Sequence, residues 1–438
     1  MTSKTFGYTS LVMNILEKVL GTKFSVTGTE NLNDQPTMFV ANHFTRSETF
    51  FVPYLIYKKT HKQSRTLADY KLYIGLLGKF LRSVGTVSTK SEKRDNIIIG
   101  DLIKGSHNWI IYPEGSMVKN KHIIHNNLFI SNTPSRVGPV RTGSAVLALK
   151  SQLLRHDFID AVNQNNQEII KQFKQDYDVE FSENLANLQT QIIPLNITYY
   201  PIRPGQNKIQ TIATRLIKKI PSQIIEELEI EGNMLMGAEI NIHFGKPINI
   251  ANYIKNKRLV INQIPIIKQE TKNNIILKYY RSKLTSDFME RIYNDCEINF
   301  DHLFIASLMH FSHDEINIFH LKKIIYYSAI LITKSNNYRC NHSIDKSTIY
   351  KIFAEEKFFA FDDVFNLALK QNIIKINDKN IIEINKTSFE KNTNFHEIRL
   401  ENTLHVVANE FALLDNANAI VKRVSRLEED DLSQKIFN

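Results

Sequence analysis

The chain has 438 residues, of which 42% are hydrophobic and 23% are charged. This composition is typical of a folded protein, and the length predicts two domains of about 100–200 residues each. No uninterrupted apolar stretch reaches the roughly 18 residues that a membrane span needs. We also expect no secretory leader, because no basic-then-apolar N-terminal segment with a small-residue cleavage site is visible.

The cysteine count and the net charge narrow the classes of protein further. Cys296 and Cys340 are the two cysteines, which excludes a disulfide framework and a multi-cysteine metal site and predicts a cytosolic compartment. The net charge of +10 and the pI near 9.2 favour anionic partners. Phosphate-bearing substrates, an anionic lipid surface and nucleic acid all satisfy that charge.

The first predicted element lies in an N-terminal region, 1–30. Within residues 8–20, apolar side chains recur at helical spacing and form one stripe. The stripe consists of Leu11, Val12, Ile15, Leu16, Val19 and Leu20. Two interpretations stay open: a helix packed on its own domain, or an interfacial helix lying in a membrane surface.

Residues 31–254 alternate between strand-like and helix-like patterns. Short apolar runs at 37–41, 108–113, 191–200 and 239–245 read as strands, and helical patterns lie at 70–82 and 141–154. This alternation predicts an α/β domain with a largely parallel sheet flanked by helices. Residues 155–190, rich in Asn and Gln, resemble an insertion.

Residues 255–438 change in character and predict a mostly helical C-terminal domain. The run 372–385 is an exception, since a polar turn at Asn377–Asn380 indicates a hairpin. With a helix at 361–371 it would form a winged-helix-like unit. Nucleic acid binding is disfavoured, because the segment contains no arginine and Asp362 and Asp363 open its helix.

The first chemical motif is Asn42-His43, followed five residues after the histidine by Glu48. Thr45 and Glu48 form a capping-box pattern, which predicts a helix start near Thr45. His43 then lies in the turn at the carboxyl end of a strand, where open α/β sheets bind ligands. Glu48 either only caps the helix or orients His43 as a general base. The H-x4-E spacing does not fit a zinc pair on one helix face.

The second motif is Tyr112-Pro113-Glu114-Gly115-Ser116, at the end of a predicted strand. Gly115 permits close backbone approach to an anionic group. Lys119 and Lys121 follow shortly after. Taken alone this motif is weak, because Pro and Gly are common in loops.

Together the two motifs, followed by Ile193-Pro194-Leu195, resemble the glycerolipid acyltransferase family. That family carries N-H-x4-D/E, then F-P-E-G-T/S-R-S, then V-P-V in this order. The runs 141–150 and 244–248 are similar to its later helix and closing strand, so the resemblance spans about 36–250. Segments in 255–438 resemble the extra C-terminal domain of larger bacterial members.

The resemblance implies an O-acyltransferase of phospholipid synthesis. His43 and Glu48 would be catalytic, and Asn42, Glu114, Gly115 and Ser116 would bind substrate. The acyl donor would be an acyl thioester of coenzyme A or acyl carrier protein. The acceptor would be glycerol 3-phosphate or 1-acylglycerol 3-phosphate.

The resemblance also implies how the site works and where the protein acts. Backbone amides near Gly115 would stabilise an oxyanion or bind phosphate. No bound cofactor and no metal are expected. The expected partners are the thioester donor, the acceptor and the cytoplasmic membrane surface, with acyl carrier protein as a candidate. The protein would be peripheral at the inner face of that membrane, with basic residues attracting anionic lipid. These are Lys58, Lys59, Lys62 and Arg65.

Two departures from the family pattern concern phosphate binding. Met117 replaces the arginine after P-E-G-S, and Ser88 and Ser91 replace Phe and Arg of the second family motif, G-x-x-F-I-x-R. Lysine is a point charge and lacks the bidentate fork of arginine. The candidate replacements are Arg82, Lys90, Lys93, Lys119 and Lys121. An acceptor without phosphate, or a non-catalytic relative that binds lipid or acyl carrier, therefore stays an alternative.

Overall fold

The structure is a computed structural model that describes most of the chain. The described residues are 21–45, 47–70, 73, 82, 85–115, 117–118, 124–125, 128–133, 136–203, 237–354, 357–379, 381–390 and 398–437. The helix predicted at 8–20, and most of that predicted at 70–82, lie outside them. Spatial contacts divide the chain into two units. The first is Met1–Met117, Pro139–Ile197 and Asn207–Ile292, and the second is Val118–Gly138, Thr198–Gln206 and Tyr293–Asn438.

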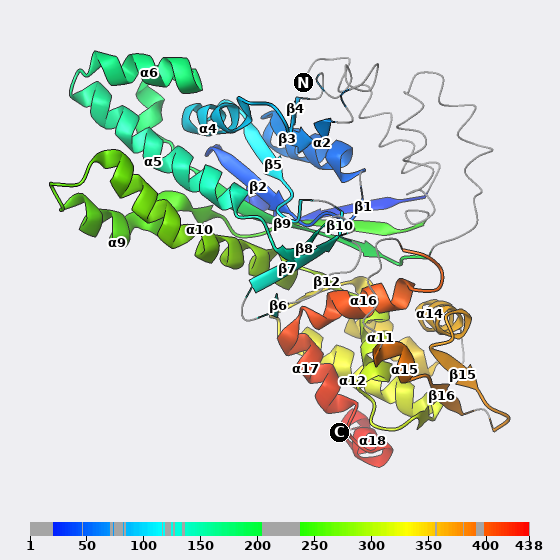
Figure 1. Cartoon of the computed structure of the whole chain (residues 1–438). Coiled ribbons are helices and arrows are strands. Elements are labelled where there is room, and N and C mark those ends of the chain that lie inside the picture. The colour runs from blue at the N-terminus through cyan, green and yellow to red at the C-terminus, as the bar shows by residue number, and fades with distance from the viewer. Residues whose placement is uncertain are drawn as a thin grey trace, which may run out of the picture. The chain divides into compact units, whose positions relative to one another are not determined.

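An eight-stranded sheet forms the centre of the first unit (Figure 1). Its strands are β1 (Lys23–Thr27), β2 (Thr37–Ala41), β3 (Ser64–Ala68), β4 (Thr86–Ser88), β5 (Asn108–Ile111), β9 (Gln191–Tyr200), β10 (Glu239–Phe244) and β11 (Ile248–Asn249). The order is β1-β10-β9-β2-β5-β3-β4, with β11 antiparallel on β9. Neighbouring strands pair in parallel at β1/β10, β9/β2, β2/β5, β5/β3 and β3/β4. The prediction of a largely parallel sheet is therefore confirmed.

The central strands read as continuous apolar runs because both faces of the sheet are covered. All residues of β2 and β9 are buried. The helices of this unit are α2 (Glu48–Thr60), α4 (Arg94–Lys104), α5 (Gly143–Asn163), α6 (Gln167–Tyr177), α9 (Ile250–Asn262) and α10 (Gln269–Asn294). Figure 1 shows α5 and α10 running along the sheet.

The region predicted as an insertion, 155–190, is packed into the first unit. Helix α5 continues to Asn163, and α6 follows it. At Gly100 of α4, an added Cβ would lie 2.1 Å from the carbonyl oxygen of Tyr177, so these two helices meet at van der Waals contact of their backbones. Helices α9 and α10, which the sequence analysis placed with the C-terminal domain from 255 onward, group with the first unit.

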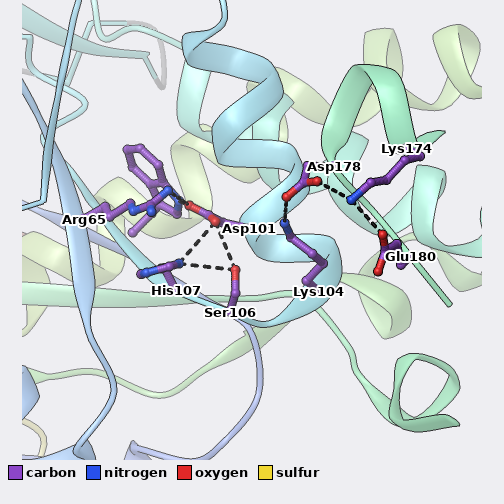
Figure 2. Close-up of polar contacts among 9 residues, drawn as sticks. Arg65, Asp101, Lys104, Ser106, His107, Lys174, Asp178 and Glu180 are labelled. Atoms are coloured by element: carbon purple, nitrogen blue, oxygen red, sulfur yellow. Dashed lines mark hydrogen bonds and ion pairs between the residues drawn. The ribbon is translucent and has the colours of Figure 1, made fainter. Parts of the chain in front are cut away.

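A buried carboxylate ties α4 to the sheet (Figure 2). Asp101 is 5% exposed and accepts hydrogen bonds from Arg65 at 2.8 Å, from the Trp109 indole at 3.0 Å and from Ser106 at 2.9 Å, with the His107 ring nitrogen at 3.2 Å. Burial raises the pKa of Asp101, but hydrogen bonding to His107 and the charge of Arg65 outweigh it, so the pKa lies below its usual range. Four partners for one carboxylate explain why this charge is tolerated inside the unit.

The second unit is mostly helical, as predicted. Its helices are α11 (Phe300–His310), α12 (Ile318–Lys334), α13 (Lys346–Ile349), α14 (Phe359–Lys370), α15 (Thr387–Glu390), α16 (Thr403–Ala412), α17 (Asp415–Val424) and α18 (Glu429–Phe437). Its short strands are β6 (Ile124–His125), β7 (Leu128–Thr133), β8 (Arg136–Pro139), β12 (Glu297–Ile298), β13 (Glu315–Ile316), β14 (Arg339–Cys340), β15 (Ile374–Ile376) and β16 (Ile382–Ile384).

The hairpin expected at 372–385 is formed by β15 and β16, which pair antiparallel, and β13 pairs with β16 on the other side. Helix α14 precedes the hairpin, so the order of elements is that of a winged helix. Asp363 of α14 binds Arg203 at 2.6 Å, and Asp301 binds the same guanidinium through both oxygens. The acidic start of α14 therefore serves an ion pair within the unit.

Among the helices that the structure describes, none combines the length and the apolar character required for a membrane crossing.

Candidate active site

The two sequence motifs follow neighbouring strands of the sheet. Strands β2 and β5 are parallel, and Val40 pairs with Ile111. Their carboxyl ends therefore lie at the same sheet edge, which places the turn after Ala41 beside the turn that begins at Tyr112. Two segments about 70 residues apart in sequence are brought together by this pairing, at the edge where α/β proteins bind ligands.

His43 and Glu48 form a hydrogen-bonded pair, as predicted. Nδ1 of His43 lies 2.7 Å from a carboxylate oxygen of Glu48. The Glu48 side chain is fully buried, and the His43 side chain is 13% exposed. Because a carboxylate only accepts, Nδ1 carries the proton and Nε2 holds a lone pair in the neutral ring. Among the described residues, Nε2 has no hydrogen-bond partner.

Glu48 also fixes the turn that carries His43. Its carboxylate accepts the backbone N–H groups of Phe44 at 3.0 and 3.1 Å and of Thr45 at 2.9 Å. Helix α2 begins at Glu48 with Ser47 as its N-cap residue, so the predicted start near Thr45 is three residues too early. The two interpretations of Glu48 were posed as alternatives, yet one carboxylate both holds the turn amides and orients the histidine.

Asn42 is a positioning residue in this structure. The sequence motif predicted that Asn42 binds substrate, but Asn42 is fully buried. Its side-chain amide donates to the carbonyl of Ile197 at 2.9 Å, and its oxygen accepts the N–H of Ile197 at 2.8 Å. Both polar ends are therefore occupied, and Asn42 locks the end of β2 to β9 immediately before His43.

Tyr112 packs against the catalytic candidate. Its ring stacks on the His43 ring with centroids 4.1 Å apart and an interplanar angle of 23°. Its hydroxyl is buried and has no partner among the described residues. Burial raises the pKa of Tyr112 well above its usual range, and the charge of Glu48 acts in the same direction. The phenol therefore stays protonated, and its ring restricts the position of the His43 imidazole.

Glu114 and Gly115 shape the second turn. A Glu114 oxygen accepts the backbone N–H of His43 at 3.0 Å, and Glu114 is buried. The N–H of Gly115 donates to the carbonyl of Tyr112 at 3.0 Å, so this one amide serves the turn, and the oxyanion or phosphate role expected of the backbone amides near Gly115 stays a prediction. The next amide, that of Ser116, lies outside the described residues.

Arg141 lies over this turn and was not predicted. Gly115 has φ +76, and an added Cβ would lie 3.0 Å from Nε of Arg141 and 3.3 Å from its Cζ. The backbone N–H of Arg141 donates to the carbonyl of Pro113 at 3.2 Å. Arg141 is exposed to solvent. A guanidinium therefore stands beside the Gly115 turn, just before α5.

The other predicted cations lie elsewhere or are not described. Lys90 follows β4, and its ammonium sits 3.6 Å from the centroid of the Tyr70 ring. Strand β4 is three positions from β2, which is roughly 14 Å at about 4.8 Å per strand. Arg82 stands over Tyr73 at 5.8 Å, and Lys93 is the exposed N-cap residue of α4. Ser116, Lys119 and Lys121 lie outside the described residues.

One group of metal-ligand side chains occurs in the described part of the second unit. Cys296, His302 and Glu410 are buried, with ligand atoms within 4.8 Å of one another. However, Nδ1 of His302 accepts the N–H of Asn299 at 3.3 Å, so Nε2 carries the proton and faces Glu410 at 3.7 Å. A protonated nitrogen has no lone pair for a metal, and the His302–Glu410 distance of 3.7 Å fits a polar contact between the two side chains.

A comparison with family models agrees with the motifs. Residues 23–162 match the family model described as Acyltransferase. The crystal structure of the 1-acyl-sn-glycerophosphate (LPA) acyltransferase PlsC from Thermotoga maritima is similar at 12% sequence identity and a TM-score of 0.29. That similarity covers 65% of this chain and 84% of the other. No curated protein matches the sequence.

Proposed function

We propose that this chain, whose residues 23–162 form a domain of the acyltransferase family, transfers a fatty acyl group from a thioester to a glycerol-phosphate-type hydroxyl in glycerolipid synthesis. The observation that carries the proposal is the His43–Glu48 pair at 2.7 Å, with Nε2 of His43 left for a substrate. A non-catalytic relative would need the Glu48 carboxylate only for the turn amides. It would not need the histidine that Glu48 orients and Tyr112 restricts, so the assembled pair favours the enzyme.

The proposed reaction uses the lone pair on Nε2. His43 takes the proton of the acceptor hydroxyl as its oxygen attacks the thioester carbonyl. The tetrahedral intermediate then collapses and breaks the carbon–sulfur bond. The protonated Nε2 returns its proton to the leaving sulfur, which gives an ester and a free thiol. Glu48 stabilises the imidazolium that exists between these two transfers.

Arg141 is our candidate for recognising the acceptor phosphate. It supplies the planar, bidentate donor that Met117 removes from the family position. Its side chain lies against Gly115, on the turn that contacts His43 through Glu114. Lys119 and Lys121, which follow the same turn in sequence, stay candidates for the same role.

The donor and the location complete the proposal. An acyl thioester of coenzyme A or of acyl carrier protein would supply the acyl group, since both present the same reacting carbonyl. The lipid product favours a peripheral protein at the inner face of the cytoplasmic membrane. Of the predicted basic cluster, Lys58 and Lys59 are exposed. Arg65 is paired with Asp101, and Lys62 is partly buried with its pKa lowered by burial despite the opposing charge of Asp34.

The test is incubation of the purified chain with radiolabelled acyl thioester and a panel of acceptors: glycerol 3-phosphate, 1-acylglycerol 3-phosphate and a lyso-lipid without phosphate. We expect labelled ester from at least one phosphate-bearing acceptor, and none with His43→Ala. His313→Ala, which changes an exposed histidine, should retain full activity. Label found only with the phosphate-free acceptor would reject the acceptor class, and no label with any acceptor or donor would reject the enzyme.

A further inference from the structure

The end of α9 and the turn that leads to α10 expose large aliphatic side chains, and this segment is called the α9–α10 turn below. Leu259 is 58% exposed, Val260 61%, Ile264 40% and Ile266 93%. These four residues lie within the eight positions 259–266, so they form one apolar tip and not scattered single contacts. Exposed apolar surface of this kind indicates a binding surface in a soluble protein.

The tip is held in place by the helices beneath it. Gln269 and Asn273 at the start of α10 both donate to the carboxylate of Asp157 on α5, at 3.0 and 2.6 Å. Ile254 and Ile261 of α9 are buried. The apolar face that stabilises α9 is therefore already packed, and the aliphatic tip is additional to it.

The chain on both sides of the tip is strongly basic. Residues 255–283 contain eight basic side chains and a single acidic one, Glu270. Lys272 is buried and donates to the carbonyl of Asn262. The basic side chains that are exposed or partly exposed are Lys255, Lys257, Arg258, Lys268, Lys278, Arg281 and Lys283. Lys257 lies 4.8 Å from the ring centroid of Tyr279, which is itself 56% exposed. An aliphatic tip bordered by cations and one aromatic ring is complementary to a surface with anionic headgroups above an apolar interior.

We propose that the α9–α10 turn docks on an anionic phospholipid bilayer, with Leu259, Val260, Ile264 and Ile266 entering the headgroup–acyl boundary and the surrounding cations meeting lipid phosphates. Nucleic acid would satisfy the charge, but it would leave four aliphatic side chains in water. The inference does not depend on the proposed enzymatic reaction, because it rests on exposure and charge alone.

Vesicle flotation of the full-length chain tests this. Wild type should float with vesicles of phosphatidylcholine and phosphatidylglycerol, less at high salt, and not with phosphatidylcholine alone. Ile266→Asp should weaken this binding about tenfold or more, since it places a charge at the tip. Phe181→Asp is the matched control, because Phe181 is 56% exposed and is flanked by Asp178, Glu180 and Glu183. It should float like wild type.

Two double-lysine variants distinguish electrostatic docking at the tip from nonspecific adhesion of a basic protein. Lys255→Gln with Lys268→Gln should weaken flotation, and Lys375→Gln with Lys379→Gln on the β15–β16 hairpin should not. All four lysines are exposed. Equal flotation of wild type and Ile266→Asp would overturn the proposal, as would equal loss in the two lysine pairs.

A fluorescent reporter distinguishes the partners. Trp109, the single tryptophan, is fully buried, so its fluorescence should not change on binding. In the I266W variant, a change in emission therefore comes from the tryptophan at the tip. Its emission should shift to the blue with anionic vesicles, and the F181W emission should not. A shift with duplex DNA and none with vesicles would overturn the lipid assignment. Acylation of a soluble acceptor is measured separately, so failure of docking and failure of catalysis are distinguishable.

Discussion

The backbone N–H of His43 donates to the carboxylate of Glu114 at 3.0 Å, which links the ends of β2 and β5 directly at the catalytic candidate. This hydrogen bond gives Glu114 a positioning role toward His43. Glu114→Gln keeps an oxygen acceptor but loses the charge-assisted bond, so we expect kcat to fall about tenfold with little change in KM. Steady-state kinetics check this, with exposed Glu183→Gln as control. A change confined to KM would assign Glu114 to substrate binding.

Asn42→Ala should lower stability. It removes both hydrogen bonds to Ile197 and leaves a buried N–H and C=O of β9 without these partners, at a cost of about 2–3 kcal/mol in the free energy of unfolding. Urea denaturation measures this cost. If Asn42→Ala abolished activity at unchanged stability, Asn42 would contact substrate, as the sequence analysis expected.

Arg141→Gln should affect the acceptor selectively. Loss of a charge-assisted contact to phosphate should raise KM for a phosphate-bearing acceptor about tenfold or more. The KM for the thioester should change much less. The control is Arg399→Gln, because Arg399 is also exposed. Equal increases for both substrates would show that Arg141 only supports the Gly115 turn.

His156 predicts a loss of stability in mild acid. Burial lowers its pKa to about 4, with the charges of Arg258 and Arg155 acting in the same direction. His156 in the unfolded chain has a pKa near 6.5. Between pH 6.5 and 4 the unfolded chain therefore binds a proton that the folded chain does not bind. Stability is full above pH 6.5 and falls as the pH decreases toward 4. Urea denaturation between pH 7.5 and 4.5 measures the free energy of unfolding, and His156→Gln should lose less of it than wild type as the pH falls. An equal loss in both proteins would show that His156 is not the group responsible.

Asp101→Asn tests the network of Figure 2. The neutral side chain cannot accept from Arg65, Ser106 and Trp109 as the carboxylate does, and we expect a loss of about 2–4 kcal/mol in the free energy of unfolding. Thermal and urea unfolding measure it. The exposed pair formed by Asp95 and Arg94 is the comparison, since Asp95→Asn should cost less than about 1 kcal/mol.

Most of the correct predictions came from the spacing of residues that are close in sequence. His43 and Glu48 are five residues apart, and a turn followed by a helix brings them together whatever the rest of the chain does. The parallel sheet followed from apolar runs that are buried on both faces. The start of α2 was placed too early, because Glu48 bonds the Thr45 and Phe44 amides ahead of the helix and Ser47 is the N-cap residue.

Long-range contacts account for what the sequence did not reveal. Arg141 is 26 positions from Gly115, and only the sheet edge and the start of α5 bring its guanidinium there. Asn42 looked like a ligand because it precedes the histidine, yet its partner is Ile197 on β9. The run 141–150 resembles the family's later helix and begins with a basic residue, which was the signal that could have identified Arg141.

The most direct test of the account is a single-turnover measurement of acyl transfer by wild type, His43→Ala and Glu48→Gln, each first shown by circular dichroism to be folded. Because the proposed mechanism assigns general-base catalysis to His43 and control of its tautomer to Glu48, we predict that His43→Ala lowers the rate of the chemical step by about 10²–10⁴-fold, and that Glu48→Gln lowers it by a smaller but still large factor. Acyl transfer at the wild-type rate by folded His43→Ala would contradict the assignment of His43 as the base.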